Sequence, residues 1–382
     1  MVGRPLQIPA FATNETFVAP LKAWDGLPTK SAPAPAKIAE GLTPAERPPA
    51  EVLNWLFNNY GAMFTHLADI QLRNWNVRTA DSTGTPLAVV SVAAQDTGVG
   101  LRDAFLAVLD GTTSSLVQMS ADGIHWTDSS TGIGAGHVLF DAVAFVSASK
   151  WLVVGETGRI YQRALGSTGS WTQSGPGSGA HLRAVGYRTG VAVAVGDSGR
   201  ILTSPDGTTW TSRTSGTAEH LVDVVWGNGV WLAVGENGAI TYSTNDGVAW
   251  TAVTLVSFPD CTHVLFDAVT QRFVVFLNVG TGAVYVVPST IVSGGSFAYD
   301  VGVLPKAVAV TPSGMIAAVF SQYVAWSADD GRTWSSWSQM PREDGAGSGF
   351  VYQALAFSAS HGCFVAGGDG TGPMLAQSLR AS

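Results

Sequence analysis

Four of the chain's seven histidines recur about forty residues apart, each close to the start of an apolar segment typical of a β-strand. These candidate binding residues are His137, His181, His220 and His263. Imidazoles gathered around one opening could bind a metal ion or an anion, or change charge near pH 6.5. The simpler interpretation, which we favour, is that each imidazole hydrogen-bonds a loop beside it. We therefore assign no metal and no cofactor to the four histidines.

Three acidic residues also recur at one position of the repeat, each at the start of a glycine-containing turn in VGETGR, VGDSGR or VGENGA. They are Glu156, Asp197 and Glu236. As turn residues they need no further explanation. A rim of carboxylates could also bind calcium or sugar hydroxyls, and carbohydrate recognition would call for exposed aromatic rings beside them. Nearby aromatic residues that could serve are Trp151, Tyr187, Trp226 and Trp231.

One phrase is written four times along the chain: SADGIHW at 120–126, SPDGTTW at 204–210, STNDGVAW at 243–250 and SADDGRTW at 327–334. Its serine and aspartate can hydrogen-bond nearby backbone groups, and its glycine can supply a positive φ angle. A catalytic site needs a base, a nucleophile and a stabilising group converging on one cleft. A phrase that recurs once per repeat points to separate places, so we interpret it as architecture and assign no catalytic residue.

The repeat that carries these residues predicts an all-β, seven-bladed β-propeller. Residues 181–215 align with residues 220–254, and each copy holds four short alternating runs separated by turn signals. Further copies lie at 86–130, 137–174, 263–287, 304–339 and 350–378. Seven units of four strands make a propeller. The last copy lacks a fourth run, so we expect residues 74–79 to supply it and close a domain spanning 74–382.

Two segments precede this domain. Residues 1–48 hold eight of the 18 prolines and predict an extended Pro-rich docking arm, with a disordered tail as the alternative. Residues 49–73 place apolar side chains at three- and four-residue steps, which predicts one amphipathic helix. Its apolar stripe either packs on the following domain or pairs with copies of itself.

The repeated phrase resembles the Asp boxes of sialidase-type propellers, and AVAVGDSGRILTSPDGTTW is similar to blades of the photosystem-assembly-factor-like propellers. The resemblance covers about residues 75–382 and implies the fold. Sialidases of this group use an arginine triad, a tyrosine nucleophile with a glutamate partner, and an acidic acid/base residue. Their usual Arg-Ile-Pro signature before the first Asp box has no match in this chain.

AWDGLPTK at 23–30 and IAEGLTPAERPPAEVLNWLFN at 38–58 resemble the N-terminal region of many bacteriophage tail and virion-appendage proteins. In those proteins a Pro-rich arm leads into a helix of this type. The resemblance implies that Trp24, Asn54 and Trp55 belong to a module that docks on other virion proteins through residues 1–73. It also implies a place in the virion, which is assembled in the host cytoplasm.

Composition excludes several other classes of protein. The formal net charge is −8 and Lys plus Arg number only 20, without a basic stripe, so nucleic acid is not an expected partner. The two cysteines fit neither a metal-ligand spacing nor a disulfide framework. No apolar run approaches the length of a membrane helix and the first residues lack a secretory signal, so we expect neither membrane insertion nor export by that route.

The function expected from these patterns is that of a structural, non-enzymatic virion appendage of a tailed bacteriophage. Its propeller would contact a host-surface glycan or a protein, and several copies per particle would strengthen weak contacts through avidity. Homo-oligomerisation is left open. The alternative is a propeller glycosidase or depolymerase acting on cell-surface polysaccharide, and a third possibility is an intracellular assembly factor.

Overall fold

The computed structural model describes residues 75–79, 88–95, 104–110, 115–177, 179–254, 259–279, 282–288, 296–300, 304–335, 337–340, 351–369 and 374–378. The chain divides into two units, residues 1–70 and 71–382, and all described residues belong to the second unit. The predicted arm and helix therefore lie outside the described residues, as do Trp24, Asn54 and Trp55.

The described strands form seven antiparallel sheets of four strands each, which we call blades 1 to 7. Blade 1 contains β2 (Ala88–Ala94), β3 (Phe105–Asp110), β4 (Leu116–Ser120) and β5 (Thr127–Asp128). Blade 2 contains β6 (Leu139–Phe145), β7 (Lys150–Gly155), β8 (Ile160–Ala164) and β9 (Thr172–Gln173). Blade 3 contains β10 (Leu182–Arg188), β11 (Val191–Gly196), β12 (Arg200–Ser204) and β13 (Thr211–Thr214).

The remaining blades follow the same order. Blade 4 contains β14 (Leu221–Gly227), β15 (Val230–Gly235), β16 (Ala239–Ser243) and β17 (Thr251–Thr254). Blade 5 contains β18 (Cys261–Asp267), β19 (Arg272–Leu277), β20 (Ala283–Pro288) and β21 (Ser296–Asp300). Blade 6 contains β22 (Ala307–Val310), β23 (Ile316–Phe320), β24 (Tyr323–Ser327) and β25 (Ser338–Gln339). Blade 7 contains β26 (Val351–Ser358), β27 (Cys363–Asp369), β28 (Met374–Ser378) and β1 (Trp75–Thr79).

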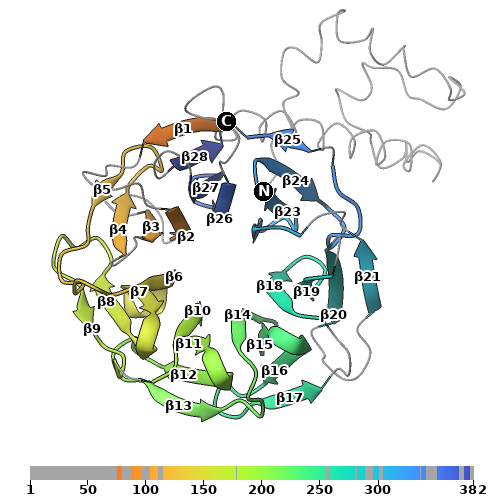
Figure 1. The fold of residues 1–382 in the computed structure, drawn as a ribbon, viewed down its shortest axis with the longest axis horizontal. Helices are drawn as coiled ribbons and strands as arrows, with labels where there is room; N and C mark the ends of the chain where they lie inside the picture. Colours follow the sequence, from red (N-terminus) through yellow and green to blue (C-terminus); the bar gives the residue numbers. More distant parts are fainter. Residues whose placement is uncertain are drawn as a thin grey trace, which may run out of the picture. The chain divides into compact units, whose positions relative to one another are not determined.

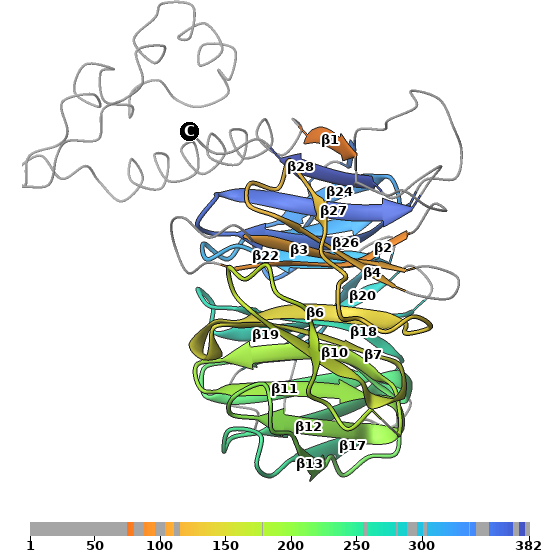
Figure 2. The ribbon, with the colours of Figure 1, turned by 90° about the vertical axis from the view of Figure 1, so that its left-hand side faces the viewer.

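The blades stand around one axis and close into a ring (Figure 1). Each innermost strand contacts the innermost strands of both neighbours, in the order β2, β6, β10, β14, β18, β22 and β26, and β26 contacts β2 again. Figure 2 shows the same blades from the side, stacked with their sheets facing one another. The prediction of an all-β propeller is confirmed.

Two distant parts of the chain complete blade 7. β1 pairs antiparallel with β28, from Trp75 opposite Ser378 to Thr79 opposite Met374. The outer strand of this blade therefore comes from the beginning of the propeller, and its three inner strands come from the end. A strand added in this way satisfies the backbone hydrogen-bonding groups that would otherwise be exposed along the edge of β28.

Apolar side chains fill the space between neighbouring blades. One cluster joins Val193 and Ile201 of blade 3 to Trp231 and Trp250 of blade 4. Trp126 of blade 1 likewise packs in a cluster with residues of blade 7. Burying such rings contributes a large part of the stabilising apolar area. The tryptophans of the repeated phrase thus pack between blades.

Short 3₁₀ turns connect the second and third strands of three consecutive blades: η4 (Glu156–Gly158), η5 (Asp197–Gly199) and η6 (Glu236–Gly238). Their central residues Thr157, Ser198 and Asn237 have φ between 52° and 56°. A further 3₁₀ turn, η3 (Val146–Ala148), lies between β6 and β7. None of the described helices is long and apolar enough to span a membrane.

We predict that Gly196→Ala destabilises the propeller. An added Cβ would lie 1.9 Å from the carbonyl oxygen of His181, which is backbone and cannot move without disturbing the start of β10. The expected loss of unfolding free energy is about 1–3 kcal/mol, measured by urea denaturation. Gly169→Ala is the control, since only the Ser167 hydroxyl lies near its added Cβ. Equal stability of the two variants would contradict the close approach of backbone at Gly196.

Candidate functional site

The antiparallel blades give the propeller two distinct faces. One, which we call the turn face, carries η4, η5 and η6 together with the starts of the innermost strands. The other, which we call the Asp-box face, carries the hairpins between first and second strands and the segments 120–126, 204–210, 243–250 and 327–334. Any candidate site must be assigned to one of these faces or to the ring axis between them.

Two of the predicted histidines bind the turns of the preceding blade. Nδ1 of His181 accepts a hydrogen bond of 3.1 Å from the Thr157 amide in η4. Nδ1 of His220 accepts one of 3.0 Å from the Ser198 amide in η5. A nitrogen that accepts a hydrogen bond carries no proton, so both contacts require an unprotonated Nδ1. This geometry supports the interpretation that the imidazoles hydrogen-bond neighbouring loops.

The four histidines are not equivalent, which corrects the register assigned from the sequence. In blade 5 the place of His181 and His220 is taken by Asp260, whose Oδ1 accepts the Asn237 amide at 2.8 Å. His263 lies three residues further on, within β18, at the place that Ala184 and Asp223 occupy in blades 3 and 4. Sequence reasoning missed Asp260, although it directly precedes the first strand residue, as His181 and His220 do.

The outer two histidines have environments of their own. Nδ1 of His137 contacts the hydroxyl of Tyr161, and desolvation and then the charge of Arg159 lower the pKa of this imidazole. Burial lowers the pKa of His263 to about 4, against a smaller opposing hydrogen bond to the Lys306 backbone. Both imidazoles are therefore neutral at physiological pH. His137 and His263 therefore do not fit a set of four equivalent histidines that gains charge near pH 6.5.

The predicted acidic residues lie on the turn face beside these histidines. The Asp197 carboxylate forms an ion pair with Arg183 and lies 3.5 Å from Nδ1 of His220. The Glu156 amide donates a 2.9 Å hydrogen bond to the Val138 carbonyl, and the Glu236 amide donates one of 2.9 Å to the His220 carbonyl. Each acceptor lies just before the inner strand of the same blade. Within the described part of the chain, no group of three His, Cys, Asp or Glu side chains could hold a metal ion.

The aromatic residues considered for carbohydrate recognition separate into two groups. Trp151 and Trp231 are fully buried, whereas Tyr187 and Trp226 each keep 37% of their surface exposed. The exposed pair lies near the ends of β10 and β14, towards the Asp-box face. The structure therefore does not bring the exposed rings together with the carboxylates of the turn face.

Two half-buried carboxyls near the ring axis were missed by the sequence reasoning. Asp141 on β6 accepts hydrogen bonds from the Ser91 hydroxyl at 2.8 Å and from the Val185 amide at 2.9 Å, which links blades 1, 2 and 3. Asp223 on β14 accepts the Val264 amide of blade 5 at 2.8 Å. The available signal was an aspartate at the same place in LFDAVAF and LVDVVWG, in the middle of otherwise apolar strands.

The position of these carboxyls inside the ring raises their pKa values. Desolvation raises the pKa of Asp141 to about 6, against opposing hydrogen bonds from Val185 and Ser91. Desolvation likewise raises the pKa of Asp223 to about 7, and the charge of Asp141 adds to that shift. The two carboxyls therefore titrate near neutral pH, where an ordinary exposed aspartate is already ionised.

The Asp-box segments use their polar side chains to fix a tight turn. In 204–210, the Ser204 hydroxyl accepts the Gly207 amide at 2.8 Å, and Oδ1 of Asp206 accepts the Thr208 and Thr209 amides at 2.8 Å each. The hydrogen bond from the Thr209 amide is the largest influence on the pKa of Asp206, and it lowers that pKa. Burial opposes this effect, but the pKa is lowered overall. The segments 120–126, 243–250 and 327–334 repeat this arrangement.

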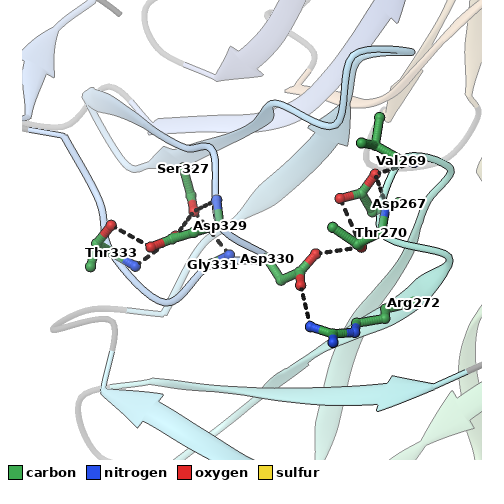
Figure 3. A network of polar contacts seen from close by, with 9 residues as sticks. All are labelled: Asp267, Val269, Thr270, Arg272, Ser327, Asp329, Asp330, Gly331 and Thr333. Carbon is green, nitrogen blue, oxygen red and sulfur yellow. Dashed lines mark hydrogen bonds and ion pairs between the residues drawn. The ribbon is translucent and has the colours of Figure 1, made fainter. Parts of the chain in front are cut away.

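Asp-box segments also bind the preceding blade. Asp330 of blade 6 accepts hydrogen bonds from Thr270 at 2.8 Å and from Arg272 at 3.2 Å, both on the first hairpin of blade 5 (Figure 3). Lys150 of blade 2 donates to the Asp206 carbonyl at 2.8 Å. Arg188 of blade 3 forms an ion pair with Asp246 of blade 4. Sequence reasoning missed these cations because each lies in a different blade from its partner.

Comparisons with known proteins place the chain by fold. No protein-family model and no curated protein matches it. Its structure is similar to the WD40 β-propeller domain of Doa1, with a TM-score of 0.60 and 15% identity over 80% of this chain and 99% of that one. It is also similar to YCF48 bound to D1 peptide, with a TM-score of 0.60 and 14% identity over 81% and 96% of the two chains.

A third similar structure is YCF48 from Cyanidioschyzon merolae, with a TM-score of 0.56 and 14% identity over 80% of this chain and 98% of that one. At these identities the likeness shows the β-propeller fold and nothing finer. The protein is accordingly a β-propeller whose function has to be argued from its own surfaces.

We predict that the Asp223 carboxyl makes the propeller less stable as pH rises. Because burial raises the folded-state pKa of Asp223 to about 7, far above that of an exposed aspartate, its stabilising contribution is complete below about pH 4 and is lost as pH rises through 7. Urea denaturation between pH 4 and 8 should show a slope of at most about 1.4 kcal/mol per pH unit from this group.

Asp223→Asn isolates this contribution, since the amide does not titrate. The comparison is needed because His263, with its lowered pKa, changes stability in the opposite direction over part of the same range. The difference between wild type and variant should therefore vary with pH between 4 and 8. A difference that stays constant over this range would contradict the raised pKa.

Proposed function

We propose that the protein is a non-enzymatic virion appendage of a tailed bacteriophage, in which residues 1–73 dock on other virion proteins and the propeller binds a glycan or protein on the host surface. The observation that carries the virion assignment is the resemblance of segments 23–30 and 38–58 to phage appendage proteins. The location in the virion, the several copies per particle and the absence of catalysis are parts of this same proposal.

The propeller's own geometry supports binding rather than catalysis. The repeated polar residues that could have done chemistry are used in bonds between blades: His181 and His220 to turn amides, and Asp330 to Thr270 and Arg272. Residues held in such bonds stabilise the ring and do not present a reactive group to a substrate. A similar propeller, YCF48, is known in a structure bound to D1 peptide, which supports polypeptide as one of the ligand classes that this fold can hold.

One observation favours the alternative of a propeller glycosidase. Asp141 and Asp223 lie near the ring axis with raised pKa values of about 6 and about 7, and the charge of one affects the other. Glycoside hydrolysis uses two carboxyls, one of them protonated near neutral pH. Both groups also accept hydrogen bonds from neighbouring blades, which accounts for their presence without catalysis.

We predict that Trp24→Ala combined with Trp55→Ala in the full-length chain abolishes incorporation into particles. Both tryptophans belong to the segments that carry the resemblance, and truncating large aromatic anchors removes most of the binding energy of a docking contact. The measurement is the amount of the chain in gradient-purified particles of the phage that encodes it. Trp226→Ala, an exposed tryptophan of the propeller, is the matched control and should be incorporated normally.

Two outcomes would overturn parts of this proposal. Particles that lack the wild-type chain would contradict the appendage role, and normal incorporation of the double variant would contradict docking through residues 1–73. Cleavage of cell-surface polysaccharide by wild type, lost in Asp141→Asn or Asp223→Asn variants that still fold, would establish the glycosidase in its place.

A further inference from the structure

Two large aromatic side chains lie next to each other on blade 6, and both are exposed. Tyr323 begins β24 and is 39% exposed, and Trp337, just before β25, is 41% exposed. Their ring centroids are 6.0 Å apart, with an angle of 52° between the ring planes. β24 and β25 are the two outer strands of this blade (Figure 1). We call Tyr323 and Trp337 the ring pair.

Packing accounts for one face of Trp337 only. This ring is stacked on Phe320 of β23, with centroids 5.0 Å apart and an angle of 14° between the planes. Phe320 itself is buried, so the indole covers it and is held nearly parallel to it. A ring that is covered on one face and is still 41% exposed offers its other face to solvent. The stacking contact therefore fixes the orientation of a flat, accessible surface.

The fold does not require an aromatic ring at the place of Tyr323. In blades 3 and 4 the first residue of the third strand is Arg200 or Ala239, and like Tyr323 it stands four positions before the serine of the Asp-box segment. Ala239 is 7% exposed, so a methyl group is enough to complete the strand there. Two adjacent rings that each keep about two fifths of their surface in water indicate a surface that binds a ligand.

The described polar residues around the ring pair are uncharged. Gln339 is exposed and lies opposite Tyr323 on β25. Trp337 precedes Gln339 by two residues and contacts Tyr323, so the three side chains share one side of the sheet. The hairpin before Tyr323 consists of Ser321 and Gln322, both half-buried. Amide and hydroxyl groups donate and accept hydrogen bonds without attracting a charged ligand.

This combination fits a neutral sugar better than a protein partner. The core of a protein interface is a contiguous apolar surface, whereas the exposed apolar surface here is two rings bordered by an amide. A pyranose presents a flat, apolar C–H face that can stack on an aromatic ring, and a rim of hydroxyls that donate and accept hydrogen bonds.

We propose that the ring pair binds a neutral oligosaccharide, with one sugar unit stacked on the free face of Trp337. Hydroxyls of the sugar bond to the Tyr323 hydroxyl and to the Gln339 amide. The inference rests on the proposed function of surface binding and deepens it, since it names the class of ligand and the place on the propeller that holds it.

The test uses the full-length chain and an array of immobilised neutral, acidic and amino oligosaccharides. Wild type should bind at least one neutral oligosaccharide, and isothermal titration with that compound then gives the Kd. Trp337→Ala should weaken binding at least about tenfold, because it removes the stacking ring. Gln339→Ala should weaken it about threefold to tenfold, because one hydrogen bond is lost. Trp337→Phe keeps a ring and should retain most of the affinity.

The control is Trp226→Ala. Trp226 is a similarly exposed tryptophan, at 37%, but it lies near the end of β14, towards the Asp-box face. This variant should bind as wild type does, and thermal unfolding of every variant verifies that the propeller is intact. If Trp337→Ala does not fold, Tyr323→Ala and Gln339→Ala, at exposed places, carry the test instead. Failure of folded wild type to bind any neutral oligosaccharide, or an unchanged Kd for the folded variants of the ring pair, would overturn the inference.

Binding of the labelled full-length chain to whole bacterial cells separates this inference from the proposed function. Binding that is lost after periodate cleavage of sugar diols, persists after protease treatment and is weakened by Trp337→Ala supports the inference. Binding that is lost only after protease treatment would mean a protein receptor, which overturns the inference while the appendage role stands. Oligosaccharide binding through the ring pair by a chain absent from phage particles would mean the reverse: the site is right and the virion assignment is wrong.

Discussion

Adjacent blades of this propeller share no backbone ladder, and this constraint governs where the polar side chains lie. Every pair of the described strands lies within one sheet, and backbone bonds between blades are isolated, such as that from the Tyr352 amide of blade 7 to the Ser321 carbonyl beside blade 6 at 2.8 Å. Apolar contacts supply most of the burial but are not directional. Directional bonds between blades therefore come mostly from side chains that reach a backbone group or an opposite charge in the next sheet.

Such bonds occur at three levels of the ring. On the turn face, His181, His220 and Asp260 accept amides from the preceding blade. Near the axis, Asp141 and Asp223 accept amides from the following blade. On the Asp-box face, side chains such as Arg272 reach the segment of the following blade. A residue that repeats along the chain is therefore more often a connection between blades than part of a site.

The fold was largely readable from the sequence, whereas the partners of individual side chains were not. Alternating runs and turn signals repeat within each copy, so they reveal the strands and their order. A contact such as Arg272 with Asp330 joins residues 58 positions apart in different copies, and nothing in the repeat itself indicates it. The place of His263 was misassigned for a related reason: blade 5 carries Asp260 where blades 3 and 4 carry His181 and His220, so residue type alone did not mark the equivalent place.

The aspartates show why repetition alone does not define a chemical role. Asp206 accepts two amides and a serine hydroxyl in an exposed turn, and its pKa is lowered. Asp223 also accepts two amides, from Val224 and Val264, but its depth in the ring outweighs them and raises its pKa to about 7. Desolvation rather than the number of donors decides the difference. Among the described aspartates, a raised pKa is therefore found at the two that lie near the ring axis, Asp141 and Asp223.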